Sequence, residues 1–122
     1  MITRIALAAL ASAAVATPAF PQATAADLKP AFSNTVVSTY PDGRTAKLWL
    51  NADGTYRAQG RRGKPSSGKW SIKGAKVCLK QSKPMAGPFS YCETIKKGGV
   101  GTSWTGKAVT GEPIKIKLVA GR

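Results

Sequence analysis

Apolar and polar residues alternate along much of the chain with a period of two. The pattern is clearest near the C-terminus, where Ile114, Ile116 and Leu118 alternate with Lys115 and Lys117. This period is typical of a β-strand that buries one face. Short runs of the same kind, rich in β-branched and aromatic residues, predict strands at 35–40, 45–50, 55–59, 67–72, 76–81, 89–95, 102–109 and 113–119.

Turn-forming residues separate the predicted strands. Asp42-Gly43 and Asp53-Gly54 each stand between two apolar runs, a pattern typical of hairpins. No segment shows helical i, i+3, i+4 spacing over a useful length, and we expect residues 26–31 to be unstructured. The pattern therefore predicts an all-β fold, a small antiparallel meander barrel or sandwich of about eight strands.

The alternation also predicts which side chains face inward. We expect an inner face built by Leu48, Leu50, Tyr56, Trp70, Ile72, Val77, Leu79, Phe89, Tyr91, Ile95, Trp104, Ile114, Ile116 and Leu118. The outer face then carries Arg57, Lys69, Lys73, Lys76, Lys80, Lys107, Lys115 and Lys117. Lysines on an outer face also discourage edge-to-edge aggregation, which is a purely structural reason for the positive charge.

The two cysteines, Cys78 and Cys92, fall in consecutive predicted strands. Their parity is opposite to that of the apolar neighbours, so both are predicted on the outer face and opposite each other if the strands pair. In an oxidising compartment a disulfide is their expected state, and closing such a loop contributes roughly 3 kcal/mol. A zinc site needs more ligands than these, and the chain has no histidine. We therefore predict a structural disulfide and no metal site.

The first residues have the features of a secretory signal peptide. Arg4 precedes an alanine-rich apolar run, and Ala23-Thr24-Ala25 places small residues where a signal peptidase reads. The apolar run is shorter than the roughly 20 residues that span a bilayer, which disfavours the alternative of a membrane anchor. We predict a signal peptide at 1–25 and one domain at 26–122, periplasmic or secreted, with no transmembrane segment.

Charge is the strongest compositional feature. The chain has 19 lysines and arginines against 5 acids, a net charge of +14 at pH 7. Such an excess favours an anionic partner, here an anionic envelope component or an acidic protein. An equally weighted alternative is a solvated basic surface that only aids solubility. Nucleic acid is not an expected partner of an exported protein.

The residue inventory argues against an enzyme. Without histidine, Ser-His-Asp and Cys-His constellations are excluded, as is the commonest general base near neutral pH. Asp42 and Asp53 are explained by their turns. Only Glu93 falls inside a predicted strand, with inward parity. It is either a buried acid paired with a lysine, a residue at the end of the barrel, or a sign that the predicted register slips there. We expect no catalytic residues and no cofactor.

Binding is the better explanation of the remaining residues. Trp49 has the parity of the outer face, where an aromatic ring among cations suits stacking on a sugar or a base; burial on both sides is the alternative. The other candidates for ligand binding are the basic loop tip Arg61, Arg62 and Lys64, the lysines around the cysteine hairpin Lys80, Lys83, Lys96 and Lys97, and Glu93.

Four short motifs carry a family resemblance. "DGTY" (53–56), "SGKW" (67–70), "GAKVCL" (74–79) and "YCETI" (91–95) resemble segments of small exported lipocalin-like bacterial β-barrel domains. The run Trp-x-x-x-Gly-x-x-x-Cys-Leu is also similar to one in bacterial inhibitors of secreted metalloproteases. The resemblance and the residues together predict an exported, non-enzymatic binding module of the bacterial envelope for anionic or small-molecule ligands. The alternative is an inhibitor of an envelope or secreted hydrolase, a protease or a lysozyme.

Overall fold

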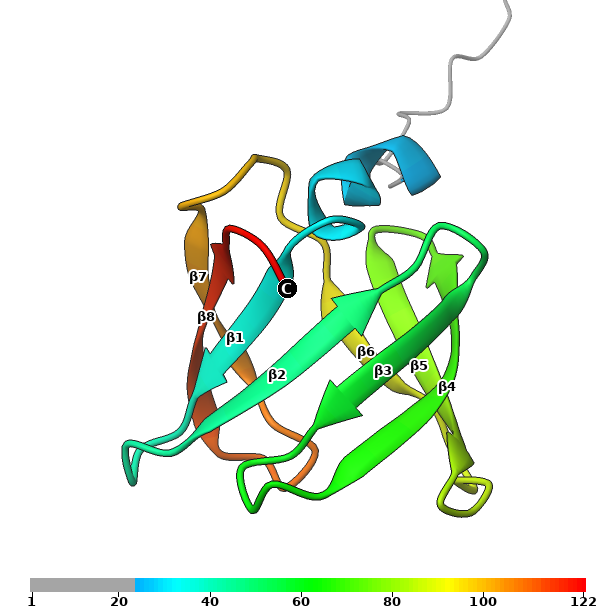
Figure 1. Cartoon of the computed structure of the whole chain (residues 1–122), viewed down its shortest axis with the longest axis vertical. Coiled ribbons are helices and arrows are strands. Elements are labelled where there is room, and N and C mark those ends of the chain that lie inside the picture. The colour runs from blue at the N-terminus through cyan, green and yellow to red at the C-terminus, as the bar shows by residue number, and fades with distance from the viewer. Residues whose placement is uncertain (1–23) are drawn as a thin grey trace, which may run out of the picture.

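A computed structural model describes residues 24–122 of the chain. Almost all of the predicted signal peptide therefore lies outside the described residues, and its cleavage after Ala25 stays a prediction. The described part contains one short 3₁₀ helix, η1 (Ala25–Ala31), followed by eight strands (Figure 1). The strands are β1 (Thr35–Thr39), β2 (Thr45–Leu50), β3 (Thr55–Gln59), β4 (Pro65–Lys73), β5 (Lys76–Lys83), β6 (Tyr91–Thr94), β7 (Ser103–Lys107) and β8 (Pro113–Val119).

All eight strands form one antiparallel sheet, which confirms the predicted all-β fold. The order is β6-β5-β4-β3-β2-β1-β8-β7, so every chain neighbour from β1 to β6 pairs directly, and β8 pairs with both β1 and β7. The sheet curls until β6 and β7 approach each other, but these two strands do not pair (Figure 1). The result is a barrel closed except for one seam between β6 and β7.

The predicted turns set the ends of the barrel. The connections at 40–44, 60–64, 84–90 and 108–112 lie at its lower end in Figure 1, whereas η1, the turns at 51–54 and 74–75 and the loop at 95–102 lie at its upper end. We call the lower end the open end and the upper end the capped end, because η1 covers the upper end.

The N-terminal segment differs from its prediction. Residues 26–31 were expected to be unstructured, yet they belong to η1, whose Leu28 and Ala31 are only 5% and 8% exposed. Leu28 and Ala31 stand three residues apart, so one face of a 3₁₀ turn brings both onto the barrel. They pack in the same cluster as Leu50 and Leu118, and η1 therefore covers one end of the barrel as a lid.

The predicted faces are confirmed with one exception. Ile114, Ile116 and Leu118 are buried, and the outward cations of the strands are exposed, including Arg57 and Lys115. Phe89 was predicted to face inward but is 65% exposed. The reason is that β6 begins only at Tyr91, so Phe89 belongs to the preceding loop and the alternation does not extend to it.

The disulfide joins Cys78 of β5 to Cys92 of β6, which are direct cross-strand partners as predicted. Their side chains have the parity of the outer face, but Cys78 is only 2% exposed. Cys78 lies on a strand flanked on both sides, by β4 and by β6, and its sulfur is bonded to that of Cys92. The bond therefore holds the short edge strand β6 against the rest of the sheet.

Candidate functional site

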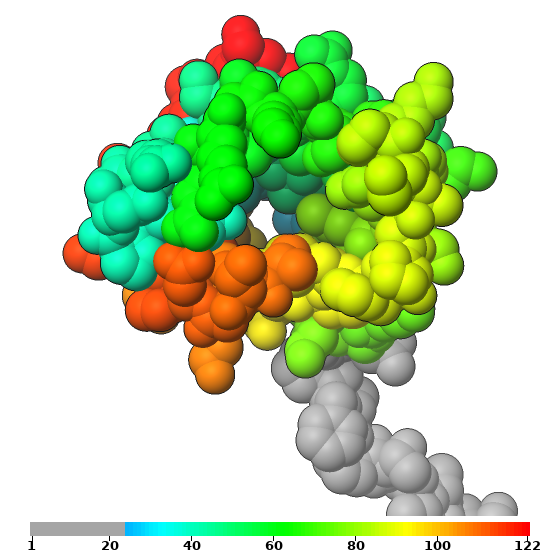
Figure 2. All heavy atoms as spheres, turned by 90° about the horizontal axis from the view of Figure 1, so that it is seen from below, coloured from blue at the N-terminus to red at the C-terminus, as the bar shows by residue number. Residues whose placement is uncertain are grey.

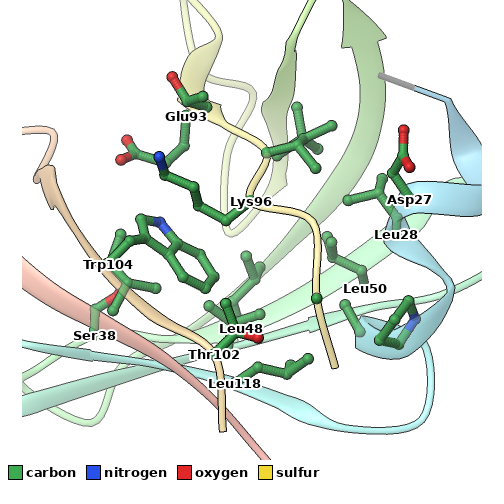
Figure 3. A pocket seen from close by; sticks show the side chains of 18 of the residues that line it. Asp27, Leu28, Ser38, Leu48, Leu50, Glu93, Lys96, Thr102, Trp104 and Leu118 are labelled. Atoms are coloured by element: carbon green, nitrogen blue, oxygen red, sulfur yellow. The ribbon is translucent and has the colours of Figure 1, made fainter. Parts of the chain in front are cut away.

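A cavity of about 100 Å³ lies inside the barrel beneath η1. Its wall is mainly aliphatic, with Leu28 of η1 on one side and Leu48 and Leu118 of the sheet on another (Figure 3). Polar side chains line the same cavity, among them Asp27, Glu93, Lys96 and Trp104. We call it the deep cavity. An apolar chamber with a few polar groups is the usual form of a small-molecule site.

Glu93 faces inward, as its parity predicted, and it lies at the seam. Its Oε2 is 2.9 Å from the hydroxyl of Tyr91, and the same hydroxyl donates to the main-chain carbonyl of Lys107 on β7. Burial, together with the hydrogen bond to Glu93, raises the pKa of Tyr91 far above its ordinary value, so the phenol stays a proton donor. These side-chain contacts join β6 to β7 where backbone pairing is absent.

Gly106 of β7 makes room for the Glu93 carboxylate. A Cβ atom at this position would lie 1.9 Å from Oε1 of Glu93, so any larger residue would displace the carboxylate. Within the described residues Oε2 has the Tyr91 contact, whereas no hydrogen bond to Oε1 is found. Oε1 of Glu93 therefore lies against Gly106 and accepts no hydrogen bond from the described residues.

Trp104 contributes a second polar atom without a partner. Its Nε1 is buried and finds no hydrogen-bond acceptor among the described residues. A buried N–H without a partner costs about 1–3 kcal/mol, so an acceptor delivered by a ligand or by water would be favourable. The deep cavity therefore combines a mainly apolar wall with several polar groups, among them the indole N–H of Trp104, which has no partner in the described residues.

The lumen continues to the open end. Two further cavities of about 410 and 170 Å³ lie there, and Leu79 and Tyr91 line both of them as well as the deep cavity. Seen from this end, the molecule is hollowed at its centre (Figure 2). Met85, Phe89 and Val109 line the larger of the two and are 72%, 65% and 65% exposed. The barrel is thus covered by η1 at one end and open at the other.

Small inward residues explain why the lumen is not filled. Ser38, Ala46, Ala58, Ser66 and Gly106 all occupy positions that face the interior, and four of them pair small residue to small residue, Ser38 with Ala46 and Ala58 with Ser66. Sequence reasoning missed this site because it listed only the large inward residues. The small residues at inward parity were the signal that could have found the lumen.

Trp49 lies on the outer face, in agreement with its parity. Its Nε1 donates to Thr35 Oγ1 at 3.0 Å, and the guanidinium of Arg57 lies 5.8 Å from the ring centroid. The ring is half-buried rather than fully exposed. Since its N–H is paired and one cation already lies over it, Trp49 is a fixed part of the wall and lies outside the lumen.

The three cations of the predicted basic loop, which is the β3–β4 turn, lie in two different environments. Arg61 does not project into solvent: its guanidinium makes two hydrogen bonds of 3.0 Å to Glu112 and lies 4.4 Å from the centroid of the Tyr40 ring. It thereby ties three turns of the open end together. Arg62 and Lys64 are exposed, and no carboxylate of the described chain lies within 4.0 Å of either.

The four lysines near the cysteine hairpin do not form one cluster. Lys80 lies on the outer wall, directly opposite Lys69, and Lys83 lies at the open end of β5. Lys96 lines the deep cavity, and Lys97 lies 4.0 Å from Asp27 of η1 at the capped end. The structure therefore brings Glu93 and Lys96 together and separates both from Lys80 and Lys83.

The Arg61–Glu112 pair gives the stability of the open end a pH dependence. The hydrogen bonds from Arg61, followed by that from Thr110, hold the pKa of Glu112 below its ordinary value. A depressed carboxyl pKa stabilises the folded state above the unfolded pKa, near 4.3, and this contribution is lost as the pH falls through the folded value. We expect Glu112→Gln to lower the melting temperature at pH 7 and to flatten its decline below about pH 5. Thermal melts from pH 7 to pH 2 measure this. The prediction is contradicted if the melting temperature of the Glu112→Gln variant falls with decreasing pH as steeply as that of the parent protein. Arg61→Gln should flatten this decline in the same way.

Comparison with models of protein families, with curated proteins and with solved structures found no match to this chain. Within residues 24–122, no helix has the length and apolar character needed to cross a membrane. In the same residues, no group of three or more His, Cys, Asp or Glu side chains is placed to hold a metal ion. The function therefore has to be argued from the lumen and its surroundings.

Proposed function

We propose that the protein is an exported, non-enzymatic binding module of the bacterial envelope that holds a small amphiphile, with its apolar part in the barrel and its anionic group at the open end. The observation that carries this proposal is the lumen, which has a mainly apolar wall, is covered by η1 at one end and is open at the other. The lipocalin-like resemblance of the strand motifs supports the same function.

The charges around the opening favour an acidic head group. The open end, together with Lys83 and Lys107 at the ends of the strands that lead into it, has six cations against two carboxylates, Asp42 and Glu112. Both carboxylates already contact arginines, Asp42 contacting Arg44 at 3.4 Å and Glu112 contacting Arg61 at 3.0 Å. Arg62, Lys64, Lys83 and Lys107 are left to attract an anion, since unpaired cations around a cleft raise the local concentration of anionic ligands.

The polar groups of the deep cavity favour a ligand that carries a hydroxyl group at its far end. A ligand that reaches it with a hydroxyl at its far end would supply an acceptor to Trp104 Nε1 and a donor to Glu93 Oε1. A purely hydrocarbon end would leave the indole N–H without a partner. The lumen therefore favours a chain with an acidic group at one end and a hydroxyl at the other.

The binding test uses dodecanoate, dodecanol and omega-hydroxydodecanoate as competitors of a fluorescent anilinonaphthalene sulfonate probe, with the full chain. We expect dodecanoate to bind with a dissociation constant on the order of 10–100 μM and to weaken with salt. Dodecanol should bind more weakly and without salt dependence, and the hydroxy acid should bind most tightly. Trp104→Phe should remove the preference for the hydroxy acid over dodecanoate while leaving dodecanoate binding nearly unchanged.

Ser66 and Ser67 provide a matched pair for locating the ligand. Ser66 lines both cavities of the open end, whereas Ser67 pairs with exposed Arg57 and has the parity of the outer wall. Ser66→Phe should fill the lumen and weaken dodecanoate at least about tenfold, and Ser67→Phe should not. Thermal melts establish that both variants fold. Equal binding by the two folded variants would place the ligand outside the barrel and reject the proposal.

A hydrolase inhibitor is the second candidate, and the loop at 84–90 is the observation that favours it. This loop presents Met85 and Phe89 in exposed positions between two strands that the disulfide joins. An exposed loop held by a rigid scaffold suits insertion into an active-site cleft. Assays with secreted metalloproteases and lysozymes at micromolar protein test this candidate, and Phe89→Ala should abolish any inhibition that depends on the loop.

A further inference from the structure

The exposed apolar side chains of the molecule are not evenly distributed. The described residues include four large apolar side chains that are highly exposed, and three of them, Met85, Phe89 and Val109, surround the opening of the barrel. They come from two connections, the β5–β6 loop and the β7–β8 turn, which lie side by side at the open end (Figures 1 and 2). The fourth, Val100, belongs to the loop at the capped end.

Unpaired cations accompany these apolar tips. Lys83 directly precedes the loop that carries Met85 and Phe89, and Lys107 directly precedes the turn that carries Val109. Arg62 and Lys64 stand on the neighbouring β3–β4 turn of the same end (Figure 1). No carboxylate of the described chain lies within 4.0 Å of any of the four.

We infer that the open end docks on the surface of a bilayer that contains anionic lipids. Separate apolar tips of this kind can enter the boundary between head groups and acyl chains, and the adjacent cations would remain at the level of the phosphates. An acidic protein would match the charge, but it would not account for apolar side chains that project singly from different connections around an opening. The lumen would then open toward the lipid rather than toward water. This inference rests on the surface of the open end, so it holds whether or not the lumen binds an amphiphile.

Vesicle binding by the full chain tests the docking. We expect the protein to sediment with vesicles of phosphatidylglycerol and phosphatidylcholine and to bind vesicles of phosphatidylcholine alone at least about tenfold more weakly. Met85→Ser combined with Phe89→Ser should weaken binding about tenfold, whereas Val100→Ser, at the other end, should leave it unchanged. Lys83→Gln with Lys107→Gln should weaken binding more than Lys69→Gln with Lys115→Gln on the outer wall.

Hydrogen exchange locates the contact independently of residues 1–23, which all variants share. Anionic vesicles should protect amides in 84–90 and 107–112 and leave those in 95–102 unchanged. The inference is overturned if protection appears only at the outer wall or the capped end. It is equally overturned if the Met85 and Phe89 variant binds like the Val100 variant. If only a soluble polyglutamate, and not the vesicles, protects the open end, the surface docks an acidic protein and the bilayer is rejected.

Discussion

Replacing Gly68 with alanine is expected to lower the free energy of unfolding by about 3 kcal/mol or more. Gly68 lies on β4 where it faces the interior, and a Cβ atom there would lie 2.0 Å from the carbonyl oxygen of Lys80 and 2.9 Å from the Tyr56 ring. The carbonyl belongs to the backbone of β5 and cannot rotate away as a flexible side chain would. The clash therefore has to be relieved by moving β4 and β5 apart.

The register of the sheet explains why the two strands approach so closely at Gly68. Pairing between β4 and β5 is interrupted between Ser67 and Gly68, where Ser67 pairs with Lys83 and Gly68 with Gln81. A bulge of this kind bends the sheet and increases its twist, which helps a sheet of eight strands to curl into a barrel. Alanine at this position should therefore also disturb the curvature that brings β6 toward β7.

Urea unfolding followed by tryptophan fluorescence measures the effect, with Gly99→Ala as the matched control. A Cβ atom at Gly99 would meet nothing within 4 Å, and its φ lies outside the left-handed region. We expect the control to stay within about 0.5 kcal/mol of the parent protein. For the Gly68 variant, the loss corresponds to a fall in melting temperature of about 12 °C or more. If the two alanine variants proved equally stable, the close approach of β5 to Gly68 would not be a constraint on the fold.

The strands were predictable because their signals are local. Alternation fixed the range of β8, and the Asp-Gly turns on either side of β2 bounded that strand on both sides, because each signal depends on residues only a few positions apart. The same parity placed Glu93 inside the barrel, although it could not show what the carboxylate contacts. Tyr91 and Glu93 meet β7 across the seam, and no feature of the β6 sequence indicates that contact.

The residues whose surroundings were predicted wrongly are positioned by contacts between distant parts of the chain. Arg61 was predicted at a free loop tip, but its partner Glu112 stands 51 residues away and becomes a neighbour only when the barrel curls. The role of η1 as a lid depends in the same way on Leu50 and Leu118, which form its binding surface. Short 3₁₀ segments have too few residues to show a period, so their position comes from packing rather than from a sequence pattern.

The lumen itself follows from side-chain volume rather than from pattern. A pattern of alternating apolar and polar residues treats an inward-facing serine, such as Ser66, as an exception to the pattern. It does not show that the small side chain leaves empty space. In a barrel of eight strands the interior is filled only if enough inward residues are large, since the diameter is set by the number of strands and their stagger. The small residues on adjacent strands, Ala58 and Ser66, stand directly opposite each other and so create a continuous space.

Removal of the disulfide by Cys78→Ala and Cys92→Ala is expected to lower the free energy of unfolding by about 2–5 kcal/mol. The two cysteines are 14 residues apart in sequence, and a cross-link that closes such a loop restricts the unfolded chain by about 3 kcal/mol in the chain-entropy account. Cys78 is also only 2% exposed, so its truncation removes packing as well. The reduced parent protein separates the two contributions, because it loses the cross-link but keeps both side chains.

Removal of the disulfide should loosen β6 more than it destabilises the barrel as a whole. β6 has four residues, pairs with β5 alone and lies at the open seam. The disulfide is therefore a direct cross-link between this short edge strand and the rest of the sheet. Without it, we expect amide exchange to rise first in 91–94 and ligand binding to fall before the barrel unfolds, because Tyr91 and Glu93 line the deep cavity from β6. Hydrogen exchange and probe binding, measured on the same double variant, follow both changes. Uniform loss of protection across all eight strands would instead mean that β6 and the barrel unfold as one unit, and that the disulfide has no separate role in holding β6 at the wall of the deep cavity.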